Sequence, residues 1–575
     1  MNFDLAQVPF SRFGSYTALS HLSAHGARPE GLYLRSVRGA VPGPEHMQIA
    51  FRLQPLAGDN PVAYRAIASA THLRLETETG FVELCLPDAD RVLVRGQGAG
   101  LRLTATPGRF DHAFPRAGGR WQVTLQTLQE KYMLSTVQGR LAVEAPWQVD
   151  ASTAIRFDLL PDPQTGIVDC AIDEFVATWL ETPVQPFERA LAEIDAEFGA
   201  WLMRTPEVPD AYAATRELAA YITWSCVVAP EGLLTRPAML MSKNWMASLW
   251  SWDNCFNALA LAYCQPGLAW DQFMLPFEHQ DAQGGLPDFI NDRLIFRTFC
   301  KPPVQGWTLR RMMAQGGGLD RARLQEAYEP LGRWTHWWLE QRDDDRDGVP
   351  QYNHGNDSGW DNSTAFALLP PFESPDLSAY LVLQMDTLAQ IAHRLGKPGE
   401  AAGWKSRADA LLAGLIRHSW RGDHFVAPRS GDHSVRKSDS LLLFVPLLLG
   451  ERLPETLRSS LLAGLTRPGR FITPHGLASE SVASPDYIPD GYWRGPIWGA
   501  STLLLTDGLA ACGQPELARR LSTSFCDLAA RSGLAENYDA LSGAGLRDRA
   551  FTWTASIFLI LAHELSRPAS EPKPQ

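Results

Sequence analysis

The chain has 575 residues, of which 45% are hydrophobic and 20% are charged, and its formal net charge is −12. This length exceeds the size at which one hydrophobic core stops growing, so two domains are expected. The acidic balance, without any basic stripe, argues against a nucleic-acid partner, and no apolar run is long enough to span a bilayer.

The cysteines and the N-terminus indicate a reducing compartment. Eight cysteines are scattered along the chain without a CxxC pair, a pattern typical of free thiols rather than of disulfides or a zinc site. The first seven residues lack the basic start and apolar core of a signal peptide. A cytoplasmic location is therefore expected, and nothing in the sequence indicates an oligomeric state.

Apolar side chains alternate with polar ones in the first part of the chain. Glycine-rich breaks, such as residues 96–100, separate the alternating runs. Short strands with frequent turns predict an antiparallel β-sandwich over residues 1–178. The clearest runs are residues 81–86, 121–126, 143–149 and 155–159.

The apolar period becomes that of a helix from about residue 187. Ser374 and Pro375 suit a helix cap and a first helical position, and Gly396 suits the end of the same helix. About a dozen such segments, without a repeat of fixed length, favour a closed double ring of helices over a solenoid. This domain is expected over residues 179–565, and the polar, proline-rich residues 566–575 are expected to be disordered.

Several segments of the helical region combine tryptophan with hydrogen-bonding side chains. A sugar site needs both, a flat ring for the C–H face and polar groups for the hydroxyls. Any one cluster is equally consistent with a core tryptophan beside a helix cap, but five in one domain favour a carbohydrate site. The clusters are residues 248–254, 301–307, 354–363 and 490–498, and a weaker fifth comprises 536–539 and 551–554.

Four of these motifs occur in an order that resembles glycoside hydrolase family 63. They are Trp252-Asp253, residues 303–307, residues 358–363 and residues 492–498. The Ser-Gly-Trp-Asp element also resembles the family 37 trehalases. The resemblance covers the helical domain, about two thirds of the chain. It implies an (α/α)6 barrel and hydrolysis of a glycoside with inversion, in a family that includes α-glucosidases and mannosylglycerate and glucosylglycerate hydrolases.

The resemblance also implies roles for three acidic residues. Asp361 matches the general acid, Glu536 the general base, and Asp253 a carboxylate that holds the hydroxyls of the cleaved sugar. The chemistry agrees, because Trp360 would desolvate Asp361 and favour its protonated form, while an ionised Glu536 could deprotonate water. In inverting enzymes these carboxyls lie roughly 6.5–9.5 Å apart. The further substrate-binding candidates are Trp252, Gln305, Trp307, His354, Trp360, Trp493, Arg494, Trp498 and Tyr538.

Two acidic rivals and one departure from the family pattern remain. Asp357 could be the acid if the loop turns differently, and Asp539 could replace Glu536. Relatives often continue Asp-Asn-Ser with Pro-Arg, whereas this chain continues with Thr364. The missing arginine weakens an anionic glycerate aglycone or trehalose as the substrate.

The leading functional hypothesis is an inverting, exo-acting α-glycosidase, an α-glucosidase acting on a small oligosaccharide or glycoside. A glycerate-glycoside hydrolase or a trehalase is the alternative within the same class. A sugar isomerase or epimerase would instead use loop histidines such as His354 and His475, and a non-catalytic carbohydrate-binding protein would not need both acids. The expected partner is a small carbohydrate, and no cofactor is required.

An acidic turn precedes the third cluster. Asp343, Asp345, Asp347 and Gly348 match the opening of a calcium-binding EF-hand loop. The twelfth position is His354, which is no bidentate carboxylate, so a solvated acidic turn is the competing interpretation. A structural calcium ion held by the three aspartates is kept as the minority hypothesis.

Overall fold

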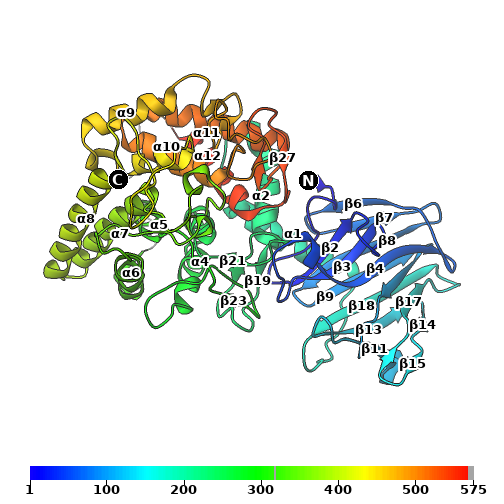
Figure 1. The fold of residues 1–575 in the computed structure, drawn as a ribbon. Helices are drawn as coiled ribbons and strands as arrows, with labels where there is room; N and C mark the ends of the chain where they lie inside the picture. Colours follow the sequence, from blue (N-terminus) through cyan, green and yellow to red (C-terminus); the bar gives the residue numbers. More distant parts are fainter. Residues whose placement is uncertain (316–318, 568–575) are drawn as a thin grey trace. The chain divides into compact units, whose positions relative to one another are not determined.

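The computed structural model describes residues 1–315 and 319–567, which form two compact units (Figure 1). The first comprises residues 1–203, 220–230 and 242–248; the second comprises 204–219, 231–241 and the chain from 249 onward. The domain boundary expected at residues 178–179 remains a proposal. In the structure, α1 (Phe187–Arg204) lies almost entirely in the first unit. Of the predicted disordered tail, residues 568–575 lie outside the described residues, and Ser566 ends a helix.

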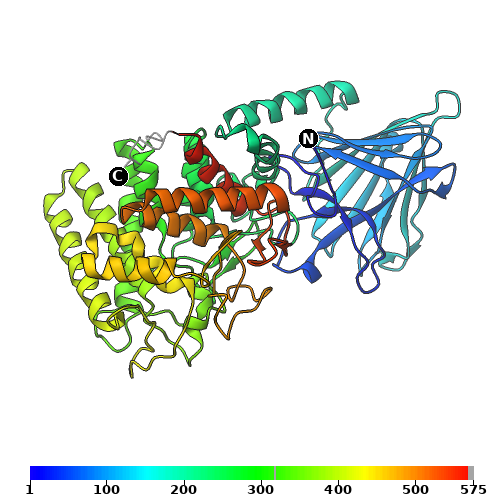
Figure 2. The ribbon, with the colours of Figure 1, turned by 90° about the horizontal axis from the view of Figure 1, so that it is seen from above.

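Two antiparallel sheets form the first unit, which is drawn in blue and cyan in Figure 2. The larger sheet has the order β1-β6-β7-β8-β9-β18-β13-β12-β11, and the smaller has β14-β17-β10-β4-β3-β2, with β5 paired to β4. The larger sheet contains β1 (Asn2–Phe3), β6 (Arg65–Ser69), β7 (Leu73–Glu76), β8 (Phe81–Asp88), β9 (Arg91–Gln97), β11 (His112–Pro115), β12 (Trp121–Leu125), β13 (Glu130–Gln138) and β18 (Ile167–Phe175). The smaller contains β2 (Thr17–Leu22), β3 (Gly31–Ser36), β4 (Gln48–Ala57), β5 (Asn60–Pro61), β10 (Gly100–Ala105), β14 (Arg140–Glu144) and β17 (Ile155–Leu160).

The core of this unit lies between the two sheets, so the predicted β-sandwich is confirmed. Leu73 and Leu75 of the larger sheet and Leu101 and Leu103 of the smaller sheet belong to one buried cluster, each the inward member of an alternating strand. The strand predicted over residues 143–149 is wrong in extent. It ends at Glu144, because Pro146 lacks the N–H that a ladder requires, and residues 147–148 pair elsewhere.

The second unit contains a closed ring of six inner helical elements within the described residues. Neighbouring pairs pack in the order α3, α5, α7, η6, α10, α12 and back to α3. Outer helices pack against them: α4 on α3, α6 and α8 on α7, α9 on η6, and α11 on α10 and α12. This is the (α/α)6 barrel that the sequence predicted.

Two of the inner elements are buried on every side, unlike an outer helix. Each residue of α3 is buried, and so are residues 441–450 of η6, whereas α11 buries only one face. A helix that is apolar on all sides belongs inside a larger core. The inner elements are α3 (Asp253–Ala262), α5 (Gln305–Ala314), α7 (Pro375–Arg394), η6 (Leu441–Arg452), α10 (Gly499–Ala511) and α12 (Thr552–Ser566). The remaining helices are α2 (Ala213–Ser225), α4 (Pro266–Glu278), α6 (Arg321–Gln341), α8 (Pro398–Ser419), α9 (Glu455–Thr466) and α11 (Pro515–Ser532).

The helix predicted from Ser374 to Gly396 is confirmed by α7. Pro375 occupies its first turn, and Gly396 follows its end with a φ of 80°. Ser374 precedes the helix but does not cap its backbone, because its hydroxyl binds the Asp376 carboxylate instead. Among the described residues, no helix combines the length and the apolar character needed to cross a membrane.

The predicted clusters share one topological position. Residues 248–254 lead into α3, residues 301–307 into α5, residues 490–498 into α10, and residues 551–554 into α12. The 354–363 segment precedes α7. Hydrogen bonds between the loops, from Asn362 to the 490–498 segment and between Ile497 and Tyr538, bring these entrances together. Short strand pairs also hold these loops: β21 (Leu249–Trp250) with β22 (Phe289–Ile290), and β26 (Asn537–Tyr538) with β27 (Gly545–Leu546).

Candidate active site

Asp361 stands at the end of a tight turn. The short helix η4 (Gly355–Ser358) ends at Gly359, whose φ of 73° lies in the left-handed region. A Cβ atom at Gly359 would lie 2.4 Å from the Trp252 ring, so glycine is required there by both conformation and space. Trp360 is fully buried, and it anchors the turn immediately before the acid.

The carboxyl group of Asp361 is partly accessible and electrostatically perturbed. Its side chain is 30% exposed, and its Oδ1 lies 4.0 Å from the Nζ of Lys301. Desolvation raises the pKa of Asp361, and the Lys301 ammonium opposes that shift. The site therefore provides a carboxyl group that both reaches solvent and holds a proton more tightly than an exposed aspartate.

Lys301 joins Asp361 to two further acidic residues. Its Nζ lies 3.3 Å from Oδ1 of Asp288 and donates a hydrogen bond of 2.9 Å to the Asn356 carbonyl. Burial raises the pKa of Asp288 to about 6 and the pKa of Asp253 well above its usual range, while Lys301 opposes both shifts. One buried cation thus opposes the effect of desolvation on three carboxyl groups.

Glu536 lies on a second loop, directly before β26. Its side chain is buried, and its backbone N–H donates to the Asp548 carbonyl at 2.7 Å. Burial raises the pKa of Glu536 to about 8, the negative charge of Asp548 adds to the shift, and Arg547 and the Tyr492 hydroxyl oppose it. Glu536 consequently holds its proton more tightly than an exposed glutamate does.

Two side chains connect the loops of Asp361 and Glu536. Asn362 donates to the Gly491 carbonyl at 3.0 Å and accepts from the Trp493 N–H at 3.0 Å. Burial raises the pKa of Tyr492, and the charges of Glu536, Asp361 and Asp253 raise it further. A single phenol therefore lies within electrostatic range of all three predicted acids.

The backbone completes this connection. Ile497 and Tyr538 exchange two hydrogen bonds, of 2.7 and 3.0 Å, which tie the 490–498 loop to β26. Arg547 donates to the Asn537 side chain at 3.0 Å, and its guanidinium lies 4.9 Å from the Tyr492 ring centroid. Segments 361–362, 490–498 and 536–538, far apart in sequence, thus form one hydrogen-bonded assembly.

The two acidic rivals have other roles in the structure. Asp357 is 1% exposed and accepts hydrogen bonds from the backbone N–H groups of Cys300 and Asn353 and from the Arg342 guanidinium. Asp539 accepts from the N–H groups of residues 541 and 542, in the turn between β26 and β27. Both carboxylates are committed to holding loops, which leaves Asp361 and Glu536 as the better candidates for proton transfer.

The tryptophans form a buried stack behind the two acids. The rings of Trp493 and Trp498 stack at a centroid distance of 4.0 Å and an interplanar angle of 3°, and Trp360 lies 4.5 Å from Trp493. Trp252 packs edge-on against Trp553 at 5.2 Å. All five side chains are at most 2% exposed. They pack behind the loops that carry the two acids, and Trp493 and Trp498 cover each other's faces.

Other predicted substrate-binding residues have polar groups that are already paired. Gln305 donates to the Ser251 carbonyl and accepts from the Trp334 indole, both at 3.0 Å. The Trp307 indole donates to Asp507, and the Tyr538 hydroxyl donates to the Gly533 carbonyl. Arg494 binds the Asp486 carbonyl. We propose that these side chains support the site from within the protein rather than contact the substrate.

His354 and three hydrogen-bond donors without a partner are the remaining candidates for contact with a ligand. His354 is exposed, its Nδ1 accepts from the Asn356 N–H, and its imidazole contributes to the electrostatics of Asp361. Within the described chain, the indole N–H groups of Trp360 and Trp553 and the amide of Asn537 are buried without a hydrogen-bond partner. Buried donors without partners are costly, so sugar hydroxyls are natural acceptors for them.

Sequence reasoning missed several residues that shape the electrostatics of the site. Lys301 and Tyr492 fell inside predicted clusters but carried no signal of their own role, because the motifs were recognised by their tryptophans. Asp288 lies outside every cluster, in the loop before β22. It lies 3.3 Å from the Nζ of Lys301, which follows on the same connection between α4 and α5.

Comparisons with known proteins agree with this architecture. Residues 246–554 match the model of the mannosylglycerate hydrolase MGH1-like glycoside hydrolase domain. Mannosylglycerate hydrolase MGH1 of Selaginella moellendorffii is 23% identical over 483 residues, covering 68% of this chain and 94% of that protein. The family 63 mannosylglycerate hydrolase of Thermus thermophilus, solved with glucose, has a TM-score of 0.52 and 23% identity over 60% of this chain and 99% of its own. A bacterial glucoamylase complexed with acarbose has a TM-score of 0.66 and 10% identity, over 97% of this chain and 94% of its own.

Proposed function

Because the chain belongs to the family of MGH1-like glycoside hydrolase domains, we propose that it hydrolyses a small glycerate glycoside with inversion at the anomeric carbon. Asp361 would act as general acid and Glu536 as general base. The observation that carries the proposal is the placement of these two perturbed carboxyls on loops that Asn362 and Tyr492 connect. The chain is a glycoside hydrolase of the family 63 type, in which inversion is typical.

The aglycone preference rests on the relatives and on nearby cations. Thr364, which replaces the proline of the family pattern, contacts Ser438 at 2.6 Å. Two residues earlier on that segment, Arg436 has a side chain that is 46% exposed, and Lys437 is also exposed. Arg436 lies 3.8 Å from the Asp486 carboxylate, which balances part of its charge. We propose that these cations, on the segment that touches the acid loop, offset the charge of a glycerate carboxylate. They would then supply the charge whose absence from the motif favoured a neutral α-glucoside.

The proposed mechanism uses each carboxyl in one proton transfer. Asp361 gives its proton to the glycosidic oxygen as the bond to the anomeric carbon breaks. Glu536 takes a proton from water as that water attacks the opposite face of the sugar, so an α-glycoside releases a β-sugar. Asp253, Asn537 and the Trp360 indole are proposed to hold the sugar hydroxyls.

The raised proton affinity of Glu536 has a kinetic consequence. In the free protein Glu536 holds its proton more tightly than an ordinary glutamate, with a pKa of about 8, while Asp361 keeps an exposed face beside Lys301. The productive state needs Glu536 ionised and Asp361 protonated. We infer that a bound substrate covers the exposed face of Asp361, which desolvates it further and raises its proton affinity.

Glycosyl fluorides distinguish the two roles. Fluoride leaves without protonation, so Asp361→Asn should keep substantial turnover of the fluoride but lose turnover of a glycoside, by about 10²–10⁴-fold. Glu536→Gln should lose both, because water activation is needed in each case. Survival of fluoride turnover in Glu536→Gln, with its loss in Asp361→Asn, would show that the roles are reversed.

The substrate class is tested on a matched panel. We expect mannosylglycerate or glucosylglycerate to be cleaved with a higher kcat/KM than a neutral α-glucoside or trehalose. Arg436→Gln with Lys437→Gln should raise KM for the glycerate glycoside and leave the neutral glucoside unchanged. Equal effects on both substrates would refute the aglycone assignment. NMR of the first product identifies its anomer, and a rearranged monosaccharide instead of a released sugar would indicate an isomerase.

A further inference from the structure

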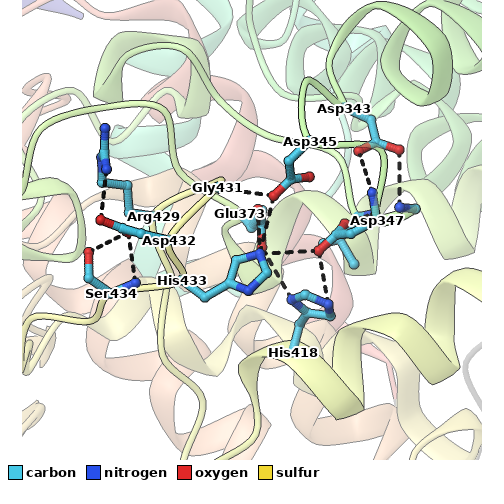
Figure 3. A network of polar contacts seen from close by, with 12 residues as sticks. Asp343, Asp345, Asp347, Glu373, His418, Arg429, Gly431, Asp432, His433 and Ser434 are labelled. Atoms are coloured by element: carbon cyan, nitrogen blue, oxygen red, sulfur yellow. Dashed lines mark hydrogen bonds and ion pairs between the residues drawn. The ribbon is translucent and has the colours of Figure 1, made fainter.

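A second cluster of ionisable side chains lies outside the proposed catalytic residues, around the loop that follows α6 (Figure 3). Nε2 of His418 lies 2.9 Å from Oδ2 of Asp347, and Nε2 of His433 lies 3.4 Å from the same oxygen. Glu373 lies between the two rings, with Oε2 3.3 Å from His418 Nδ1 and Oε1 3.7 Å from His433 Nε2. The four side chains come from three separate segments.

Glu373 is the unusual member of this cluster. It is 0% exposed, and neither of its carboxylate oxygens has a hydrogen-bond partner of normal geometry among the described residues. Desolvation raises its pKa to about 8, the charges of Asp347 and Asp345 add to the shift, and the Ser430 hydroxyl opposes it. A fully buried carboxylate that faces two imidazoles and another carboxylate needs either a proton or a cation.

We propose that Asp347, Glu373, His418 and His433 bind one divalent transition-metal ion of the zinc class. Two imidazoles with two carboxylates form a donor set that suits such ions. One donor atom from each residue lies within 4.8 Å of the others. Bonds of about 2.1 Å in a tetrahedral site place neighbouring donors about 3.4 Å apart. Oδ2 of Asp347 lies 2.9 Å from Nε2 of His418 and 3.4 Å from Nε2 of His433, and Oε1 of Glu373 lies 3.7 Å from that same nitrogen of His433, close to this separation.

The neighbouring aspartates favour this ion over calcium. The two oxygens of Asp343 accept the backbone N–H groups of Asp347 and Gly348, both at 3.1 Å, and Asp345 accepts the Gly431 N–H at 2.8 Å. These oxygens hold the turn, whereas calcium needs six to eight oxygen donors. The calcium site on Asp343, Asp345 and Asp347 stays a prediction; the site proposed here shares only Asp347 with it.

The ion would fasten the segment that leads to the proposed acid. The loop containing Asp347 runs into residues 354–363, and Tyr352 and Phe372 exchange two backbone hydrogen bonds of 2.8 Å beside Glu373. His418 ends α8, and His433 lies on the loop that follows. One ion would therefore join three segments next to the catalytic loop. Its role is structural, and no step of the reaction is assigned to it.

The test uses the full chain after treatment with a chelator. Calorimetric titration with Zn²⁺ should show one equivalent bound and a raised melting temperature, and Co²⁺ should give ligand-field absorption bands. Ca²⁺ at equal concentration should neither displace Co²⁺ nor change its absorption bands. His433→Gln should weaken Zn²⁺ binding by more than about tenfold and change the cobalt spectrum. Glu373→Gln should also weaken it.

Matched controls keep the proposal falsifiable. His424 is another exposed histidine paired with a carboxylate, that of Asp423, and it lies outside the cluster. His424→Gln should leave the affinity and the spectrum unchanged. The His433 side chain is 40% exposed, so its replacement should preserve the fold even if Glu373→Gln does not. Absence of Zn²⁺ binding by the wild type, equal binding by His433→Gln, or a preference for Ca²⁺ would overturn the proposal.

Discussion

Replacing Gly359 with alanine tests whether the acid loop is held as tightly as its packing implies. Alanine at a φ of 73° costs about 1–2 kcal/mol. Its Cβ would also lie 2.4–2.9 Å from three atoms of the Trp252 ring. Trp252 is 2% exposed and packs on Trp553, so it cannot move aside, and overpacking of this kind costs about a further 1–3 kcal/mol. We expect Gly359→Ala to destabilise the barrel by about 2–5 kcal/mol in total.

Gly396→Ala provides the matched control. Gly396 has a φ of 80°, but a Cβ atom at this position would have no neighbouring atom within 4 Å, so only the conformational cost of about 1–2 kcal/mol applies. Differential scanning calorimetry should rank the unfolding transitions as wild type, Gly396→Ala, then Gly359→Ala. Because Asp361 lies two residues beyond Gly359, kcat should also fall, by up to about 10²-fold for a shift near 1 Å, while Gly396→Ala keeps its activity. Equal losses of stability and activity in the two variants would refute the argument.

Three further predictions concern the charges and the connection of the two loops. The pKa of Glu536 rises from 4.5 to about 8 on folding, so the wild type loses stability as pH rises through that window. Glu536→Gln cannot ionise at this position. In thermal denaturation its stability relative to the wild type should therefore increase by up to about 5 kcal/mol between pH 4 and pH 9. A pH-independent difference would contradict this. Lys301→Met removes the cation that opposes the raised pKa of Asp361, so the limb of the kcat/KM profile that reports Asp361 should move to higher pH and stability should fall by about 3–5 kcal/mol; a profile with neither limb moved would exclude this coupling. Asn362→Ala removes both bonds to the 490–498 loop and should lower kcat by about 10–100-fold in steady-state assays, and an unchanged kcat would show that these bonds do not position the acid.

Periodicity in the sequence predicted elements whose stability comes from local chemistry and one-sided burial. The strands at 81–86, 121–126 and 155–159 and the helix at 375–394 follow directly from alternation and from proline and glycine at helix ends. The run at 143–149 fails at Pro146 because a missing N–H outweighs an apolar pattern. Ser374 likewise has the residue type of a cap but binds the Asp376 side chain.

The candidate site was predictable only where its residues carry a motif. Asp361 and Glu536 lie in recognisable segments, but the residues that set their proton affinities do not. Asp288 meets Lys301 within the connection between α4 and α5, where neither residue carries a motif. Tyr492 lies within electrostatic range of both acids, on a loop that Asn362 ties to the segment of Asp361. The second contact joins segments far apart in sequence, so local patterns contain no trace of it.

The abundance of tryptophan has a physical explanation in the loops at the ends of the helical ring. An acid loop without regular secondary structure needs rigid neighbours, because each degree of freedom left to Asp361 weakens its alignment with the leaving oxygen. Large flat rings supply extensive contact with few rotatable bonds. Trp360 lies next to the acid in sequence and 4.5 Å from Trp493, whose backbone N–H binds Asn362 on the other side of the acid. Asp361 is thereby held from both flanks by one ring assembly. The tryptophans that suggested a sugar-stacking surface are packed on one another, and we propose that they serve mainly as the rigid support of Asp361.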